Sequence, residues 1–281
     1  MHVHTRCSDG TSPPEEIPGM ASQAGLDGVA ITDHDAVDGI ERAIEANGHN
    51  GLEIIPGVEL STTVGGTDIH ILGYYIDWRD STLLEWIALF REKRLERARK
   101  MVAKLWALGL DLRLDTVLEI ADGAAIGRPH IADALVKEEL IEFYGEAFSR
   151  FIGYDGPAYF PKHAISPAEA IRLIRQAGGI PVLAHPGSVH RDECIPAMVR
   201  DGLLGIEVFH PMHPPMVRRH YDALAIKHGI LRTGGSDYHG EGRGRAQLGC
   251  ENVPSWTAEN LHTLKKQGIR NGAGTPAIPH P

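Results

Sequence analysis

The stretch Gly28–Asp35, which reads GVAITDHD, joins a short apolar run to a group of polar residues. Short apolar runs rich in β-branched residues predict buried strands. The residues Thr32–Asp35 would then stand at the carboxyl end of such a strand. Because α/β barrels assemble their active sites from strand ends of this kind, the segment predicts both the fold class and the place of a site.

The alternation of apolar runs and helical patterns extends on both sides of this segment. Further strands are expected at Glu53–Ile55, Ile69–Tyr75, Ile180–Ala184, Gly205–Phe209 and Ile230–Thr233. Helices are expected at Pro14–Ala24, Gly39–Ala46, Ser166–Gly178 and Met212–Gly229. Ser166 and Glu169 have the spacing of a capping box at a helix start. Repeated strand–helix–strand units predict an α/β fold with a mainly parallel sheet, closed or open.

The middle of the chain departs from this alternation. A long helix is expected from Ser81 to Gly109, with one apolar face and a run of charged residues that we expect to be a solvated face. Further helices are expected up to about Phe160. We therefore predict a barrel made of residues 1–80 and 163–281, with residues 81–162 inserted as a helical lid or substrate subdomain.

The composition limits the location and the partners of the protein. A formal net charge of −9 argues against a broad basic surface that coats nucleic acid. Three cysteines without a C-x-x-C pair favour a reducing, cytoplasmic environment over a disulfide framework. The pattern of a signal peptide is not seen at the start, and no apolar run reaches the length of a membrane span. Sixteen histidines, many beside Asp, Glu or Gly, indicate metal chemistry.

Residue types that bind metal ions recur at the expected strand ends. His2 and His4 are two positions apart, so in an extended strand both imidazoles point to the same side. A lone histidine in an apolar strand, such as His70, is often only a core residue, but recurrence at six strand ends favours a metal centre. The candidate ligands are His2, His4, Asp9, His34, Glu59, His70, His185, Asp237 and His239. Nitrogen and oxygen ligands without thiolate suit zinc, manganese or iron.

Five motifs follow one another in a characteristic order. They are H-x-H (His2–His4), T-D-H-D (Thr32–Asp35), G-V-E (Gly57–Glu59), H-P-G (His185–Gly187) and G-S-D-x-H (Gly235–His239). In this order they resemble the PHP (polymerase and histidinol phosphatase) superfamily, and the resemblance covers essentially the whole chain. G-R-P-H at Gly127–His130 and I-H-I-L-G after the glutamate are similar to one branch of it. Enzymes of that branch hydrolyse nucleoside 3′,5′-bisphosphates and trim RNA from the 5′ end.

The resemblance implies a distorted (β/α)₇ TIM-like barrel that holds two or three divalent metal ions. It implies a first metal bound by His2, His4, Glu59 and Asp237. A second metal would share Glu59 and take His70 and His185, and a third would take Asp9, His34 and His239. The reaction implied is hydrolysis of a phosphoric ester by metal-activated hydroxide, with Asp33 or His34 as a proton shuttle.

Substrate contacts are expected from three further residues. Arg128 and His130 fit a phosphate clamp that assists catalysis, because a guanidinium presents paired donors to phosphate oxygens. Alternatively, Arg128 only caps the helix expected near Pro129. His210 directly follows the strand Gly205–Phe209 and would point at the site. The expected substrates are phosphate monoesters of nucleotides, such as a nucleoside 3′,5′-bisphosphate, AMP or a short RNA 5′ end.

Two features depart from what the resemblance implies. The sequence begins at the H-x-H pair, so either the first strand is short or this start lies inside a longer protein; a short strand would loosen His2 and His4. Ser188 follows H-P-G where nucleotidase-like members often carry an arginine, with Arg191 three positions later. Recognition of a second phosphate therefore stays open.

Other functions remain open at this point. Within the same reaction class, the substrate could be histidinol phosphate or another small phosphate ester. A metal-dependent amidohydrolase would use a lysine metal bridge or a lone catalytic Asp, and neither is apparent. A non-catalytic PHP module would bind metal without turnover. The identity and number of the metals, the exact substrate and the oligomeric state are not determined by the sequence.

Overall fold

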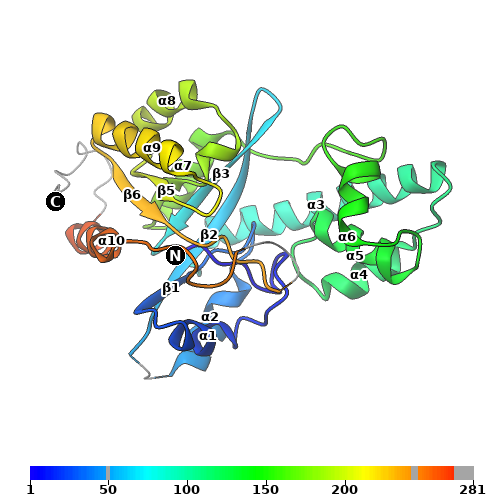
Figure 1. Ribbon diagram of the computed structural model, residues 1–281, viewed down its shortest axis with the longest axis horizontal. Coiled ribbons are helices and arrows are strands. Elements are labelled where there is room, and N and C mark those ends of the chain that lie inside the picture. Colours follow the sequence, from blue (N-terminus) through cyan, green and yellow to red (C-terminus); the bar gives the residue numbers. More distant parts are fainter. Residues whose placement is uncertain (49–50, 242–245, 269–281) are drawn as a thin grey trace.

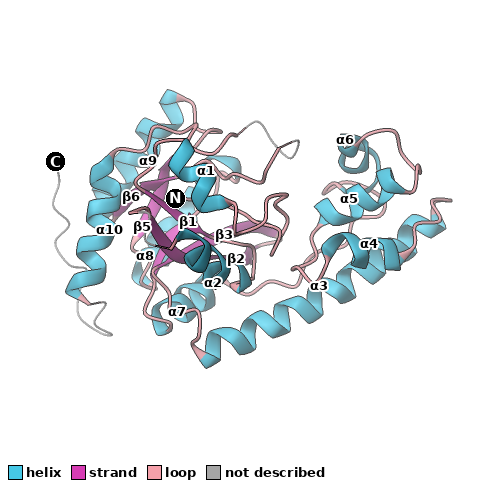
Figure 2. Cartoon of the chain, turned by 90° about the horizontal axis from the view of Figure 1, so that it is seen from below, coloured by secondary structure: helices cyan, strands magenta, loops and turns pink. Residues whose placement is uncertain are grey.

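A mixed six-stranded sheet forms the centre of the computed structural model, which describes residues 1–48, 51–241 and 246–268. Its strands are neighbours in chain order: β1 (Gly28–Ile31), β2 (Glu53–Val64), β3 (Thr67–Tyr74), β4 (Ile180–Leu183), β5 (Gly205–Phe209) and β6 (Leu231–Gly234). The sheet is curled and helices surround it (Figures 1 and 2). The α/β class expected from the sequence is therefore confirmed.

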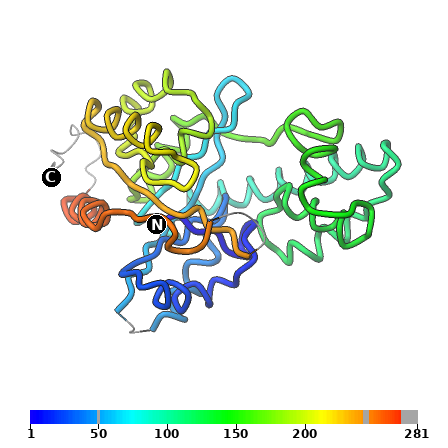
Figure 3. Tube along the Cα trace, viewed as in Figure 1, coloured from blue at the N-terminus to red at the C-terminus, as the bar shows by residue number. Residues whose placement is uncertain are grey.

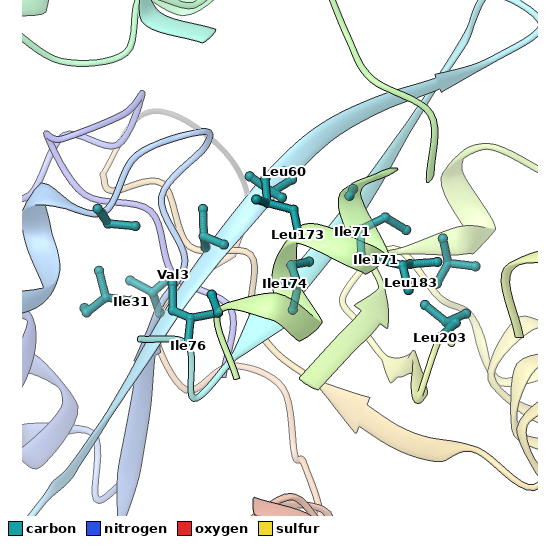
Figure 4. Close-up of a cluster of buried hydrophobic side chains, with 14 of the residues drawn as sticks. Val3, Ile31, Leu60, Ile71, Ile76, Ile171, Leu173, Ile174, Leu183 and Leu203 are labelled. Carbon is teal, nitrogen blue, oxygen red and sulfur yellow. The ribbon is translucent and has the colours of Figure 1, made fainter. Parts of the chain in front are cut away.

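The helices beside the sheet follow the expected alternation. They are α1 (Ile17–Gln23), α2 (Asp38–Asn47), α7 (Pro167–Gln176), α8 (Ile195–Arg200), α9 (Pro215–His228) and α10 (Ser255–Gln267). The capping box of α7 forms as predicted, because Ser166 Oγ accepts from the Glu169 amide and the Glu169 carboxylate accepts from the Ser166 amide. Ile171 and Ile174 then pack beside Leu60 of β2 in the apolar core (Figure 4). This packing joins α7 to the sheet.

The sheet differs from the mainly parallel one that we expected. The pairs β1–β2, β4–β5 and β5–β6 are parallel, but β3 runs antiparallel to both of its neighbours. The strand expected at Glu53–Ile55 does not stop at Pro56, because the Pro56 carbonyl still accepts a hydrogen bond from Ile76 N–H. The following hairpin turns at Gly65 and Gly66, with φ of 57° and 80°, which two-residue hairpin loops require.

The first residues of the chain lie between the two edge strands of the sheet. Val3 forms a parallel bridge with Tyr238, beyond β6, and its carbonyl accepts from Thr32 N–H, beyond β1. A side chain on Gly235 would stand 2.4 Å from His2 Cβ, so glycine is needed there for this segment to fit. The expectation that a short first strand loosens His2 is not met, because His2 is completely buried.

Residues between β3 and β4 form a helical unit with its own core. It contains α3 (Ser81–Ala107), α4 (Leu114–Ala121), α5 (Arg128–Lys137), α6 (Tyr144–Glu146) and a π-helical turn at Ala147–Ile152. Met101, Leu105 and Leu135 belong to a buried cluster that is separate from the core beside the sheet. This unit stands to one side of the sheet at the far end of α3 (Figures 1 and 3). Among the described residues, no helix combines the length and the apolar character that a bilayer span needs.

Candidate metal centre

The strand register brings candidate ligands to one edge of the sheet. His34, just beyond β1, forms a parallel bridge with Glu59 in β2. Across the β2–β3 hairpin, His70 pairs with Ser61, two residues beyond Glu59. Ala184 N–H donates to the His70 carbonyl, which sets the position of His185 at the end of β4. Residues far apart in the sequence thus lie at the same level of the sheet.

Four ligand atoms form a tight first group. The Nε2 atoms of His2 and His4 are 3.0 Å apart, and they lie 3.3 and 3.2 Å from Glu59 Oε2. They also lie 3.3 and 3.2 Å from Asp237 Oδ1. Four ligands bound tetrahedrally at about 2.0–2.1 Å stand roughly 3.3–3.4 Å from one another. The His2, His4 and Asp237 atoms therefore have a spacing that fits the ligands of a single small divalent cation, and Glu59 Oε2 lies equally close to both histidines.

Glu59 also joins a second group. Its Oε1 atom lies 3.0 Å from His70 Nδ1 and 3.0 Å from His185 Nε2. The Oε2 atom faces His2 and His4 instead, and it also lies 3.0 Å from His34 Nδ1. Because its two oxygens face different sets of histidines, Glu59 has the position of a carboxylate that bridges two metal ions.

A third group adjoins the first. Ligand atoms of His4, Asp9, His34 and His239 all lie within 4.8 Å of one another. Asp9 Oδ1 is 3.4 Å from His239 Nε2 and 3.9 Å from His4 Nδ1. All nine candidate ligands thus meet in one cluster, which we call the ligand cluster.

Buried polar atoms without hydrogen-bond partners are concentrated at the ligand cluster. Among the described residues they include His4 Nδ1, Asp9 Oδ1, His34 Nδ1, Glu59 Oε2, His210 Nε2 and Asp237 Oδ1. An unsatisfied buried polar group costs about 1–3 kcal/mol, so such a concentration calls for a physical reason. Metal ions as the partners of these atoms would supply it, and the donor set fits divalent metals.

The protonation states of Glu59 and His70 suit metal binding. Burial alone would raise the pKa of Glu59, but His34, His70 and His2 hold this pKa well below its usual range. Burial and the nearby Lys162 lower the pKa of His70 to about 3. Glu59 is therefore ionised and His70 is neutral, and these are the protonation states in which both bind metals. Burial disfavours the charged form of His2, His4, His185 and His239, but neighbouring carboxylates raise the pKa of each, so a metal ion there would have to displace a proton.

Two buried contacts orient the histidine rings. The His2 Nδ1 atom lies 3.2 and 3.3 Å from the carboxylate oxygens of Glu207, and His239 Nδ1 lies 2.9 Å from the Asp237 carbonyl. A hydrogen on Nδ1 leaves the Nε2 lone pair for a metal. Glu207 was not selected from the sequence, although a carboxylate inside the apolar strand Gly205–Phe209 is a signal, because buried carboxylates are rare unless paired.

Replacing Glu207 with glutamine is expected to weaken metal binding about 10- to 100-fold, because the negative charge that holds the Nδ1–H tautomer of His2 is lost. Metal affinity would be measured by competition with a chromophoric chelator. Glu41→Gln is a suitable control, since Glu41 pairs with Arg79 on the exposed surface. An affinity equal to that of the wild type would exclude this role for Glu207.

Two candidate ligands have unusual backbone conformations. His185 and Asp237 have φ of 26° and 51°, in the left-handed region that residues other than glycine rarely occupy. Such conformations cost about 1–3 kcal/mol each and persist where the surrounding structure enforces them. This strain adds to the indications that the cluster is functional.

A cavity of about 100 Å³ lies beside the ligand cluster, and we call it the cationic cavity. Its lining combines the candidate ligands Asp9, His34 and His70 with Arg94, Arg97, Arg128 and Lys162. Lys162 Nζ stands 3.0 Å from His70 Nε2 and 3.3 Å from Asp68 Oδ2. The four positive side chains outnumber the carboxylates of Asp9 and Asp68 in this lining, which favours an anion over a cation beside the candidate metal ligands.

The sequence missed three of these cations. The charged run in α3 is not wholly a solvated face, because Arg97 is only 8% exposed and Arg94 pairs with the buried Asp35. Arg94 and Arg97 follow Phe90 at helical spacings of four and three residues, and Met101 comes four residues later. This spacing places both arginines on the buried face of α3, so the sequence contained a signal for their position. Lys162 lies in an irregular segment, where periodicity gives no signal.

Arg128 lies in the cationic cavity as the phosphate-clamp hypothesis requires. Its guanidinium carbon stands 4.4 Å from the centre of the Tyr154 ring, an arrangement typical of cation–π contacts. Gly127, not Arg128, is the N-cap residue of α5, and the side chain of His130 caps this helix by accepting from Gly127 N–H. The alternative role of Arg128 as a helix cap thus finds no support.

His130 lies away from the cationic cavity and lines a different cavity with Arg6 and Arg42. His210 is buried, and its Nε2 atom lies 3.5 Å from Asp237 Oδ2, beside the ligand cluster. His213 is also buried, and its ring accepts from Gly187 N–H.

Asp33 holds the loop that precedes Asp9. Its Oδ1 atom accepts from Thr5 N–H at 2.7 Å and from Ser8 Oγ at 2.6 Å, and its Oδ2 atom accepts from Thr5 Oγ1 at 2.7 Å. These contacts engage both oxygens in fixing the loop between His4 and Asp9. They are more typical of a positioning residue than of the proton shuttle considered from the sequence.

A curled α/β sheet whose edge gathers histidines and carboxylates defines a metal-dependent hydrolase. The chain belongs to the PHP family, because the PHP domain model matches residues 1–147. The chain is 32% identical to a 3′,5′-nucleoside bisphosphate phosphatase from Chromobacterium violaceum, over 90% of this chain and 92% of the relative. It is 30% identical to the 5′-3′ exoribonuclease Rnm from Escherichia coli, over 85% and 84%.

Solved structures agree with this assignment. A provisionally named metal-dependent phosphoesterase from Bifidobacterium adolescentis superposes with a TM-score of 0.86 at 35% identity. The match covers 93% of this chain and 94% of that one. The protein is thus a hydrolase of the metal-dependent phosphoesterase class, as the order of its motifs indicated.

Proposed function

We propose that the protein hydrolyses phosphate monoesters of nucleotides. The substrates would be nucleoside 3′,5′-bisphosphates or AMP-type nucleotides, and short RNA 5′ ends would also be hydrolysed. The observation that carries this proposal is the contact between the ligand cluster and the cationic cavity, because a phosphoryl group needs both. The nucleotide and RNA substrates named for two relatives support the choice of substrate class.

The proposed ligands are the nine residues of the ligand cluster, in the three sets implied by the family resemblance. Two or three Mn²⁺, Fe²⁺ or Zn²⁺ ions bound there would supply a hydroxide nucleophile and neutralise charge on the phosphoryl group. Lys162 and Arg128 would bind phosphoryl oxygens from the cationic cavity. His34 would relay a proton, since it lies between Glu59 and this cavity. His210 would contact the substrate beside Asp237.

The finer architecture is also proposed. The bridge of Val3 to Tyr238 and its contact with Thr32 support a distorted (β/α)₇ barrel, with the first residues as a short seventh strand. The separate core of the helical unit supports residues 81–162 as a lid or substrate subdomain on a barrel of residues 1–80 and 163–281. Residues 49–50, 242–245 and 269–281 of that barrel lie outside the described residues. The free thiols of Cys7, Cys194 and Cys250 support a cytoplasmic location.

The other functions considered from the sequence are less well supported. An amidohydrolase would place a lysine at the metal bridge, but Glu59 has that position and Lys162 lies behind His70. A histidinol-phosphate or other small-molecule phosphatase shares the same chemistry, so only a comparison of substrates separates it. A non-catalytic module would have no need of a cationic cavity.

Phosphate release by the purified protein with Mn²⁺ tests the proposal. The panel contains adenosine 3′,5′-bisphosphate, AMP, histidinol phosphate, a 5′-phosphorylated RNA oligomer and a phosphodiester. We expect release from the nucleotides and the RNA to stop when a chelator removes the metal and to return when Mn²⁺ is added again. Turnover of histidinol phosphate alone would reject the nucleotide substrates, and metal binding without any turnover would reject catalysis.

A further inference from the structure

A second, larger cavity of about 640 Å³ opens at the ligand cluster. The cluster contributes Asp9, Asp237 and His239 to it. Its other walls include Pro129 and Tyr144 from the helical unit and Met212 from the segment between β5 and α9. The cavity therefore touches the proposed metal site and is completed by two separate parts of the fold.

The two cavities at the cluster differ in chemistry. The cationic cavity is small and its walls carry Arg128 and Lys162, so it suits a phosphoryl group. Away from the cluster, the walls of the larger cavity are Pro129, Tyr144, Pro211, Met212 and Ala246, together with the polar side chains of His210 and Ser236. This lining suits a flat, uncharged group that also offers hydrogen-bonding atoms. Its volume lies within the range of about 300–1,000 Å³ that is typical of small-molecule pockets. Asp9 and Pro129 line both cavities, so the two cavities adjoin at the edge of the cluster.

We propose that the larger cavity, termed the base cavity, binds the nucleobase of the substrate. The base packs against Tyr144 and Met212 while the phosphoryl group faces Lys162 across the ligand cluster. This inference rests on the proposed function. It explains why the protein would prefer nucleotides to other phosphate esters. The cationic cavity and the ligand cluster alone would bind any small phosphate monoester. The base cavity would strengthen the binding only of substrates that carry a nucleobase.

The proposed position of the base, against Tyr144 and Met212, also assigns a role to the helical unit. Tyr144 is held by its ring contact with Phe148, at 5.3 Å between centroids, inside the separate core of that unit. Met212 is 67% exposed and belongs to the side of the sheet. A base between them contacts both parts of the protein, so discrimination among substrates requires the helical unit.

The test compares Met212→Ala with Met216→Ala as the matched control. Both methionines are strongly exposed, so neither change disturbs a core, but only Met212 is among the described residues lining the base cavity. For AMP, we expect Met212→Ala to lower kcat/KM about fivefold or more, because a contact to the base is removed. For ribose 5-phosphate, which has no base, we expect a change of less than about twofold. Met216→Ala should leave both values unchanged.

A binding measurement separates this inference from the proposed function. Saturation-transfer NMR with adenosine, which has no phosphate, is run on the Mg²⁺-loaded wild type and on both variants. We expect adenosine to bind to the wild type and to Met216→Ala, and to bind more weakly to Met212→Ala. If adenosine binds in this way but the protein hydrolyses no phosphate ester, the proposed function is rejected. The base cavity would still be supported in that case. Two results would overturn the base cavity. One is an equal fall of kcat/KM for AMP and ribose 5-phosphate in Met212→Ala. The other is an unchanged kcat/KM for both substrates together with unchanged adenosine binding in this variant.

Discussion

Glu59→Gln is expected to lower kcat for phosphate release about 100- to 1,000-fold, the effect of removing a central electrostatic group from an active site. The Glu59 carboxylate is completely buried and faces His2 and His4 with one oxygen, and His70 and His185 with the other. Glutamine keeps the volume but removes the negative charge and one of the two oxygens. One of the first two proposed metal sites would therefore lose its ligand oxygen, and the other would keep only a neutral amide oxygen.

Two measurements on the same samples check this prediction. Phosphate release from AMP gives the activity, and elemental analysis after gel filtration gives the metal content per chain. We expect both to fall together in Glu59→Gln and to stay at wild-type values in the surface control Glu41→Gln. Full activity in Glu59→Gln would contradict a bridging carboxylate.

Lys162→Met is expected to lower kcat/KM for nucleotide substrates about 100-fold while the metal content stays unchanged. The lysine side chain is 11% exposed and its Nζ atom reaches His70 and Asp68 at the wall of the cationic cavity. An ammonium group that is shielded from water binds a phosphoryl oxygen strongly, and methionine has a similar length without the charge. The loss should appear mainly in KM if Lys162 binds the ground state, and in kcat if it acts only in the transition state.

The control for Lys162→Met is Lys137→Met, because Lys137 pairs with Glu119 on the surface of the helical unit. A fall in metal content in Lys162→Met would show that this lysine acts on the ligand His70 instead of on the substrate. Unchanged kinetics in both variants would exclude Lys162 from the phosphoryl site.

Local patterns predicted those parts of the fold and site that depend on neighbouring residues. The capping box at Ser166, the strand Gly205–Phe209 and the H-x-H pair each follow from spacings of two to four positions. The recurrence of metal-binding residue types at strand ends also selected nine residues that the structure brings together. Their assignment as metal ligands stays a prediction until metal is measured.

The features that were missed depend on tertiary structure. The continuation of β2 through Pro56 follows from a hydrogen bond to Ile76, which no local pattern reveals. Lys162 reaches His70 only because the end of the helical unit returns to β3, a contact between positions 92 residues apart. Arg97 is an exception, because its place on the buried face of α3 follows from the helical spacing of the sequence.

The placement of the first residues between the two edge strands has a consequence for folding. His2 reaches Glu207 across 205 positions of the chain, so this end of the ligand cluster cannot form until distant segments have met. Contacts of such long range are slow to form, because the entropy of the intervening chain is lost before the contact is gained. Metal ions would then bind only to the finished fold, and metal uptake during refolding would report the moment when the first residues of the chain meet β5.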